Sequence, residues 1–326
     1  DQANPPTSPG QTSDDTFDPS QKPDSSGENP AESPTDSDER PSMNFKYGGG
    51  RGGFSMGGGG ADLNYTDDEL DSYETIWDGE VTSTKKSDHK RVVTALKNIS
   101  EGNDLETYMD IDNLLRYMAV HVFSVNEDSL SGMMAHNYYL YESGGKLNLI
   151  PWDYNLALGG MGGSSDATSV VNDAIDNAFS GTNFFDTLME DETYHSQYYT
   201  YLQQLVSEYI DGGGFDAFYE RVRSQIDELV KTDPTAFYSY DEYLTAADTL
   251  YQVVKLRGQS IQGQLDGSIP STEEAQRSSD ALVDASTLDI SVMGSMNTGG
   301  GGGGFGFNAP TASENVSDAP DVAQGT

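Results

Sequence analysis

DIDNLLRYMAVHVFSVNEDSLSGMMAHNYYLYESGGKLNLIPWDYN, residues 110–155, decides the fold because its hydrophobic period changes once along its length. In its first part apolar residues recur every three or four positions, which is the pattern of an amphipathic helix. Asp110 stands just before this pattern and is predicted to be the N-cap, and the helix is predicted to end near Asn126. Its buried stripe is expected to hold Ile111, Leu114, Leu115, Met118, Val122 and Val125.

The second part of the stretch has the period of two that is typical of strands. Residues 137–142 and 146–150 are two short runs joined by Ser143-Gly144-Gly145, which predicts a β-hairpin. Residues 127–135 are polar and predict a loop before the hairpin. Pro151 is expected to stop the second strand because proline cannot donate to a sheet ladder. A second loop, residues 152–155, then follows.

This order of loop, hairpin and loop has a geometric consequence. Two strands of about five residues run out and back, so that their outer ends lie within a strand spacing or two of each other. Asp128 in the first loop and Asp153 in the second are therefore expected to face one cleft, with Asn137 close by.

The sequence around this stretch is predominantly helical. Val92, Val93, Leu96 and Ile99 share one helical face upstream. Downstream, helices are expected around 184–188 and over 194–210, 215–230 and about 241–265, with Gly212–Gly214 ending the second of these. The fold class predicted is mainly α with one small β-hairpin, an α+β domain.

Composition divides the chain into three parts. Residues 1–61 are expected to be a disordered linker, because residues 1–42 hold eight of the 13 prolines and residues 47–61 are mostly glycine. Residues 62–267 carry the helical domain. Residues 268–326 are expected to be a Ser- and Gly-rich linker or tail that leaves the domain near Ser271, apart from a short apolar patch at 288–293.

Charge and residue usage exclude several classes of protein. The 326 residues include 17 Lys and Arg against 54 Asp and Glu, a net charge of −37 that repels nucleic-acid phosphates and anionic lipids. The chain has no cysteine, which excludes disulfide scaffolds, thiol nucleophiles and Cys-ligated metal centres. Its longest apolar stretch, Tyr117–Val125, is about half of what a bilayer requires, so no membrane span is expected.

Asp128, Asn137 and Asp153 have the residue types that kinase phosphoryl transfer uses. That chemistry needs a carboxylate to orient a hydroxyl, together with an Asn and an Asp that hold magnesium against nucleotide phosphates. Mg²⁺ prefers one or two carboxylates with phosphate oxygens and waters. On spacing alone, solvated loop acids and helix caps are the favoured interpretation in a chain with 54 acids.

Four motifs in this stretch closely resemble the spore-coat-protein-H (CotH) kinase family. They are Asp112-Asn113-Leu114-Leu115-Arg116-Tyr117-Met118-Ala119-Val120, Asn126-Glu127-Asp128-Ser129, His136-Asn137-Tyr138-Tyr139-Leu140-Tyr141 and Ile150-Pro151-Trp152-Asp153-Tyr154-Asn155. The resemblance covers about residues 62–265. It implies the C-lobe of an atypical protein-kinase-like fold that uses ATP and Mg²⁺ to phosphorylate Ser or Thr of an acceptor protein, including serines of its own chain.

The resemblance also implies roles and a location. Asp128 matches the catalytic aspartate and Asp153 the magnesium-binding aspartate, while Asn137 is carried over as a second metal ligand; the residues that bind the nucleotide are not identified. Together with the absence of Cys and the linker composition, the family implies a secreted or cell-surface bacterial protein, as spore-coat proteins are.

Two features depart from this pattern. Asn155 stands where the family often has a second acid. No strand periodicity or phosphate-binding lysine precedes residue 62, so a strand-rich lobe is expected upstream of Asp1, and weak ATP affinity is expected without it. A non-catalytic extracellular scaffold or adhesion module with a kinase-like fold is therefore the alternative.

Three further polar residues are predicted to have structural roles and not catalytic ones. His121 lies in the apolar helix and is predicted to be a packed core histidine, and Arg257 is predicted to anchor helices through carboxylates. His136 is predicted to hold the loop beside Asn137 by hydrogen bonding.

Overall fold

The computed structural model describes residues 60–132, 134–160, 166–176, 179 and 181–294, together with the backbone of two short strands further on. The chain divides into two units, residues 1–53 and 54–326, and all described residues belong to the second. The linker predicted for residues 1–42 and most of the glycine tract at 47–61 lie outside the described residues.

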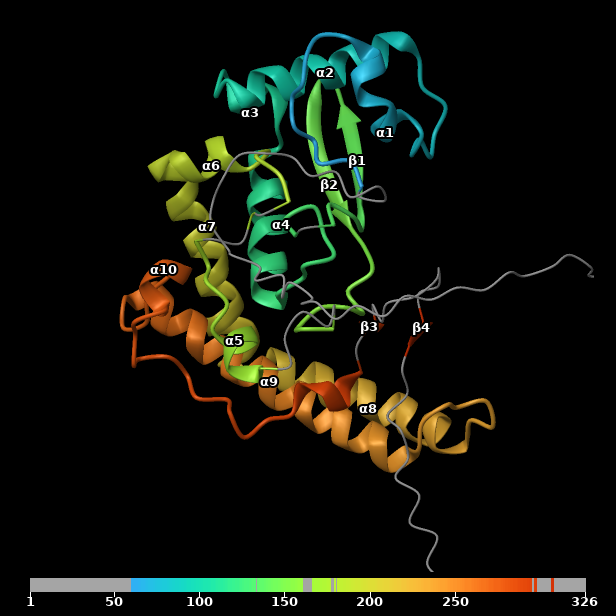
Figure 1. Cartoon of the computed structure of the whole chain (residues 1–326), viewed down its shortest axis with the longest axis vertical. Coiled ribbons are helices and arrows are strands. Elements are labelled where there is room, and N and C mark those ends of the chain that lie inside the picture. The colour runs from blue at the N-terminus through green and yellow to red at the C-terminus, as the bar shows by residue number, and fades with distance from the viewer. Residues whose placement is uncertain are drawn as a thin grey trace, which may run out of the picture. The chain divides into compact units, whose positions relative to one another are not determined.

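Helices dominate the described part of the chain, as the sequence predicts (Figure 1). In chain order the helical elements are η1 (Leu70–Tyr73), α1 (Glu74–Trp77), α2 (Lys86–Ser100), α3 (Leu105–Tyr108), α4 (Ile111–Ser124), α5 (Ala167–Val171), α6 (Asp186–Glu190), α7 (Glu192–Gln204), η2 (Leu205–Ile210), α8 (Gly214–Thr232), α9 (Tyr240–Asp266), α10 (Glu273–Gln276) and η3 (Ile290–Met293). The strands form two antiparallel pairs, β1 (Tyr138–Ser143) with β2 (Lys146–Pro151), and β3 (Met296–Asn297) with β4 (Gly306–Phe307). The mainly α architecture with a small hairpin is confirmed.

Helix α4 forms where the apolar period predicts it. The Asp110 carboxylate accepts a hydrogen bond of 3.2 Å from the Asn113 N–H, which confirms the N-cap. Leu114, Leu115 and Met118 are fully buried, and each such side chain contributes about 1.5–3 kcal/mol of hydrophobic stabilisation. In Figure 1, α4 lies between α7 and the β1–β2 hairpin, and it contacts both.

The hairpin is fixed to the first turn of α4 through the outer edge of β2, which is the edge that points away from β1. Asn113 bonds both backbone groups of Leu149, accepting from the N–H at 2.8 Å and donating to the carbonyl at 3.1 Å. The Asp110 N–H donates to the Leu147 carbonyl at 3.0 Å. Because Leu147 and Leu149 are also buried on the core face, a register shift of the hairpin would break both sets of contacts.

Pro151 belongs to β2 and pairs with Tyr138, so the expectation that it stops the strand is wrong by one residue. Leu147, Leu149 and Pro151 occupy alternate positions whose backbone groups point away from β1. A proline at such a position removes no hydrogen bond from the ladder, because the N–H that it lacks would not face β1.

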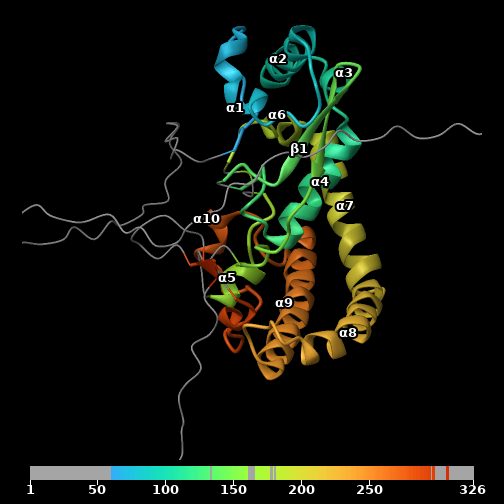
Figure 2. The same ribbon diagram turned by 90° about the vertical axis from the view of Figure 1, so that its right-hand side faces the viewer.

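The core consists of two clusters. The larger one is built by α2, α4, β2 and α7, and the smaller one by α5, α9, η3 and Phe215. Figure 2 shows α9 beside α8 and near the C-terminal end of α4. No helix within the described ranges is both long and apolar enough to cross a membrane.

Residues 271–294 pack against the domain, so the expectation that the chain leaves it near Ser271 is wrong for this stretch. The Val283 N–H donates to Asn172 Oδ1 at 2.9 Å, and Ala285 and Ile290 are buried in the smaller cluster. The apolar patch at 288–293 forms η3, which contacts α9. Outside this patch the buried side chains are scattered through a polar segment, so the sequence shows no periodicity that would predict the packing.

Arg257 on α9 is fully buried and holds four backbone carbonyl oxygens. Its guanidinium donates to Val122 at 2.7 Å, Phe123 at 3.3 Å, Val171 at 3.1 Å and Asp173 at 2.6 Å. The Asp173 carboxylate lies 3.8 Å away. The predicted anchoring role is confirmed, but carbonyl groups rather than carboxylates supply most of the contacts. Arg257 thereby joins α9 to the end of α4 and to the segment after α5.

Replacing Arg257 by Met should lower the free energy of unfolding by about 3–5 kcal/mol, because it leaves buried carbonyls without donors. Urea denaturation followed by circular dichroism measures this. Arg277→Met is the matched control; Arg277 makes only an exposed pair with Glu273 on α10, so its effect should stay within about 0.5 kcal/mol. Equal effects of the two substitutions would contradict the anchoring role.

Candidate functional site

The first loop of the site starts from an unusual end of α4. Val125 adopts the left-handed region with φ of 48°, and the Asn126 N–H donates to the His121 carbonyl at 3.1 Å. The Val125 N–H donates to the Val122 carbonyl at 3.3 Å, which completes a Schellman-type turn. This conformation is strongly disfavoured for a β-branched residue such as Val125. The surrounding contacts therefore hold the turn in place.

Asn126 and Tyr117 shape the loop around Asp128. The Asp128 N–H donates to Asn126 Oδ1 at 3.3 Å, and the Leu130 N–H donates to the Tyr117 hydroxyl at 3.1 Å. The loop then folds back on itself at Gly132, where a Cβ atom would lie 2.0 Å from the Glu127 carbonyl oxygen. Only glycine fits this close approach.

Asn137 is brought directly to Asp128. The Asn137 side-chain NH₂ donates to Asp128 Oδ2 at 2.7 Å. The Asp128 side chain is only 13% exposed, and His136 Nδ1 lies 3.8 Å from its other oxygen, Oδ1. His136 is thus within ion-pairing distance of Asp128 when protonated, although it makes no hydrogen bond to it at this distance.

The hairpin brings Asp153 back to the same end of the ribbon. Tyr138 pairs with Pro151, and beyond this pair the Trp152 N–H donates to the Asn137 carbonyl at 3.1 Å. Asp153 is exposed and follows immediately in the second loop. The two loops predicted to be neighbours are therefore neighbours, and they meet at Asn137.

The environment of Asp128 raises the pKa of its carboxyl group above the ordinary value. Burial is the largest cause, and the negative charge of Asp153 adds to it. The hydrogen bond from Asn137 and the nearby His136 act in the opposite direction. The negative charge of Asp153 therefore acts on the Asp128 carboxyl group, although burial has the larger effect.

Left-handed backbone conformations concentrate in this region. Ala135, Asn137 and Asp153 have φ of 49°, 56° and 58°. Asn and Asp tolerate this region better than other residues with a side chain, whereas Ala adopts it at a cost. Conformations of this kind persist where the surrounding structure dictates them, and they cluster at functional sites.

The donor set at this end of the hairpin fits magnesium better than a softer metal. The carboxylate of Asp153 and the amide oxygen of Asn137 are hard oxygen ligands of the kind that Mg²⁺ takes with phosphate oxygens and waters. Within the described residues no three or more His, Asp or Glu side chains gather into a complete protein cage.

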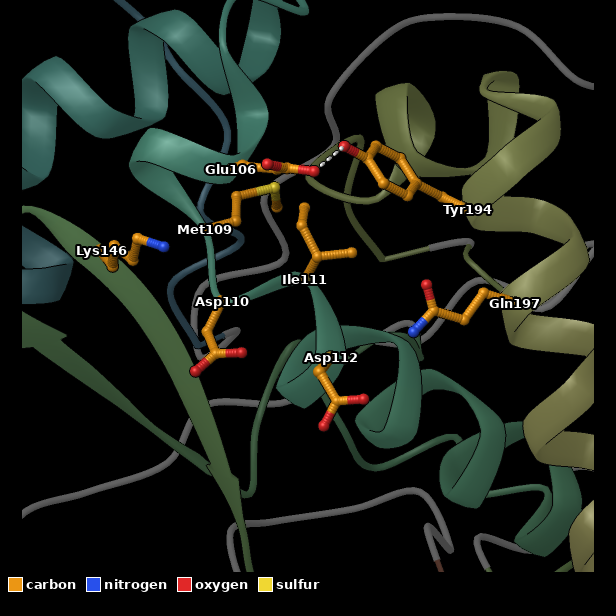
Figure 3. Close-up of a pocket in the computed structure, with 8 residues that line it drawn as sticks. All are labelled: Glu106, Met109, Asp110, Ile111, Asp112, Lys146, Tyr194 and Gln197. Carbon is orange, nitrogen blue, oxygen red and sulfur yellow. Dashed lines mark hydrogen bonds between the residues drawn. The ribbon is translucent and has the colours of Figure 1, made fainter.

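A polar hollow lies at the opposite end of α4 from the candidate site (Figure 3). It has a volume of about 330 Å³. Its acids already have partners: Asp110 caps α4, Asp112 bonds Arg116 and Tyr201, and Glu106 accepts from Tyr194. The capping role expected for the Asp110–Asn113 segment is confirmed. Because α4 spans about 20 Å, this hollow is separate from the candidate site.

Sequence reasoning missed the aromatic residues of the hairpin beside the site. Tyr139 and Trp152 are both about half exposed, and their rings stack with centroids 5.9 Å apart. The strand alternation places Tyr139 on the outer face, which was the available signal. His121 is buried, as predicted, and stacks on Tyr117 with ring centroids 3.8 Å apart.

One family model matches most of the described part of the chain. The model of the family described as CotH kinase protein matches residues 54–261, more than half of the chain. No curated protein matches the sequence. The matched residues include both loops and the hairpin between them.

Removing the Asn137 amide should raise the pKa of Asp128, because the carboxylate loses a hydrogen bond that favours its charged form. Asn137→Gly is the suitable change, since glycine accepts the φ of 56° without strain. Carboxyl ¹³C NMR titration measures the pKa. Asn148→Ala on β2 is the control and should leave the Asp128 titration unchanged. A lowered or unaltered value in Asn137→Gly would contradict the contact.

Proposed function

Because this chain belongs to the CotH kinase protein family, we propose that it carries the catalytic loops of a protein kinase. The kinase transfers the γ-phosphoryl group of ATP to a Ser or Thr hydroxyl of an acceptor protein. The observation that supports this most is the hydrogen bond of 2.7 Å between Asn137 and Asp128, made where the second loop delivers Asp153. A carboxylate, an Asn and an Asp at one cleft are the equipment of kinase phosphoryl transfer.

Asp128 is the proposed base. Its carboxylate orients the acceptor hydroxyl and takes its proton while the hydroxyl oxygen bonds to the γ-phosphorus. The bond between that phosphorus and the β,γ-bridging oxygen breaks, and ADP leaves with the electron pair. The raised pKa of Asp128 suits this role, since a carboxylate in a partly buried site holds a proton more readily than one in water.

Asp153 and Asn137 are the proposed magnesium ligands. A bound Mg²⁺ would neutralise negative charge on the phosphates. Asn137 has a second function in this scheme, because its NH₂ group holds Asp128 while its amide oxygen faces no donor among the described hydrogen bonds. One side chain thus couples the position of the base to the position of the metal ligands.

We place the protein outside the bacterial cell as part of this proposal. Its support is the Pro-, Ser- and Gly-rich composition of the terminal segments and the absence of cysteine. A non-catalytic extracellular module is the second candidate, favoured by Asn155 in the second loop, where a further acid would strengthen cation binding. Calorimetry with Mg²⁺ and ATP separates the two, because a module without nucleotide chemistry gives no binding heat.

Asp128→Asn and Asp153→Asn should each reduce phosphate transfer at least about a hundredfold, since one variant removes the base and the other a metal ligand. The measurement is incorporation of label from γ-labelled ATP into the protein itself and into Ser- and Thr-containing peptides. Asp280→Asn is the control, because Asp280 is exposed and distant in sequence from the site. Incorporation that persists in both site variants would remove these roles.

A further inference from the structure

The second half of the first loop is in direct contact with the segment that enters the described part of the chain. The Gly60 N–H donates to the Met134 carbonyl at 3.0 Å. A Cβ atom at Gly60 would overlap the Ala135 carbonyl oxygen and would lie 2.6 Å from His136 Cδ2. The backbone of Gly60 therefore rests against the loop at a distance that only glycine allows.

A second glycine, Gly181, makes the same kind of approach from the segment before α6. A Cβ atom there would overlap the Gly132 carbonyl oxygen and would lie 3.1 Å from the Leu130 carbonyl oxygen. Gly132 is the residue at which the loop folds back on itself, and Leu130 is fully buried. The loop is thus contacted at its turn by Gly181 and near its end by Gly60.

The two contacting segments are also bonded to each other. The Thr182 hydroxyl donates to the Asp62 carbonyl, and the Asn183 N–H donates to Asn64 Oδ1 at 2.8 Å. Thr182 is only 4% exposed, and its oxygen accepts from the Phe184 N–H at 3.0 Å. Because Phe184 is buried in the larger core cluster, the bonded pair of segments is anchored in the domain. We call residues 60–64 and 181–183 the clasp.

We propose that Gly60, Gly181 and Thr182 of the clasp are positioning residues for phosphate transfer, because they hold the loop that carries Asp128. This inference rests on the proposed function and adds residues that act on the base without touching the substrate. A base must lie within hydrogen-bond reach of the hydroxyl whose proton it takes. A displacement of about 1 Å can cost about a hundredfold in rate.

The metal ligands are held by different contacts. Asn137 is fixed across the ribbon, where the Trp152 N–H donates to its carbonyl at 3.1 Å, and Asp153 lies in the second loop. Opening the clasp should therefore displace Asp128 more than it displaces the metal ligands. The expected effect is a loss of kcat with little change in the KM for MgATP, which a general loss of structure would not produce.

Hydrogen exchange of the full-length chain tests whether the clasp orders the loop. Thr182→Val removes the hydroxyl but keeps the size of the side chain, so exchange over residues 127–135 should become about tenfold faster while exchange in α9 stays unchanged. Thr182→Ser keeps the hydroxyl and should exchange close to the wild-type rate. Thr187→Val on α6 is the matched control, because Thr187 Oγ1 is buried and has no hydrogen-bond partner among the described residues.

Phosphate transfer to a Ser- and Thr-containing peptide gives the kinetic readout in the same variants. With MgATP varied up to millimolar concentration, Thr182→Val should lower kcat about tenfold and Gly181→Ala about a hundredfold. The KM for MgATP should stay within about twofold of the wild-type value, and Thr182→Ser should recover kcat. Gly79→Ala is the control for the glycine change, because a Cβ atom at Gly79 would meet no listed neighbour closer than 3.5 Å.

The outcomes separate this inference from the proposed function. Unchanged exchange over residues 127–135 in both Thr182→Val and Gly181→Ala would overturn the clasp, whatever the activity. Faster exchange throughout the domain, or faster loop exchange with an unaltered kcat, would overturn the positioning role and leave the proposed function standing. A wild-type chain that transfers no phosphate would overturn the proposed function and the positioning role together, and the exchange rates would still decide whether the clasp orders the loop.

Discussion

The candidate site depends on how the C-terminal end of α4 is satisfied, because the first loop starts there. The last four carbonyls of this helix need donors from outside its own hydrogen-bond pattern. Arg257 supplies donors to Val122 and Phe123, and the Asn126 and Leu158 N–H groups supply those to His121 and Ser124. The donors come from α9, from Asn126 just before the first loop and from Leu158 in the turn that follows the second loop. A helix end that would otherwise bury unpaired acceptors thus becomes the point at which all three segments meet.

The same helix sets the position of the hairpin at its other end. Asn113 and Asp110 bond the outer edge of β2, and the two-residue turn at Gly144–Gly145 then fixes which residues of β1 pair with it. With this register, Asn137 and Trp152 lie opposite each other just beyond the strands. The left-handed residues of the two loops are held by these constraints rather than by their own preference. The geometry of Asp128, Asn137 and Asp153 is therefore a consequence of the packing of α4.

Sequence reasoning captured the features that a period encodes. The 3.6-residue repeat of α4 and the alternation around Ser143–Gly145 were sufficient to predict both elements and the closeness of the two loops. It missed features that depend on single contacts. Pro151 extends β2 because of the register, and Ala285 is buried although the segment around it has no helical or strand period. The carbonyl partners of Arg257 come from segments more than 80 residues away, and no local pattern announces such contacts. The roles of Asp128, Asn137 and Asp153 and the kinase-like C-lobe remain predictions.

Electrostatics limits what the proposed site can accept. A chain with a net charge of −37 repels a free triphosphate at long range. Asp128 and Asp153 add to this repulsion at short range, because both side chains are acids at the same end of the hairpin. In the proposed scheme a cation between the acids and the phosphates reduces the repulsion. We therefore expect a nucleotide to approach these loops together with its magnesium ion and not as the free anion.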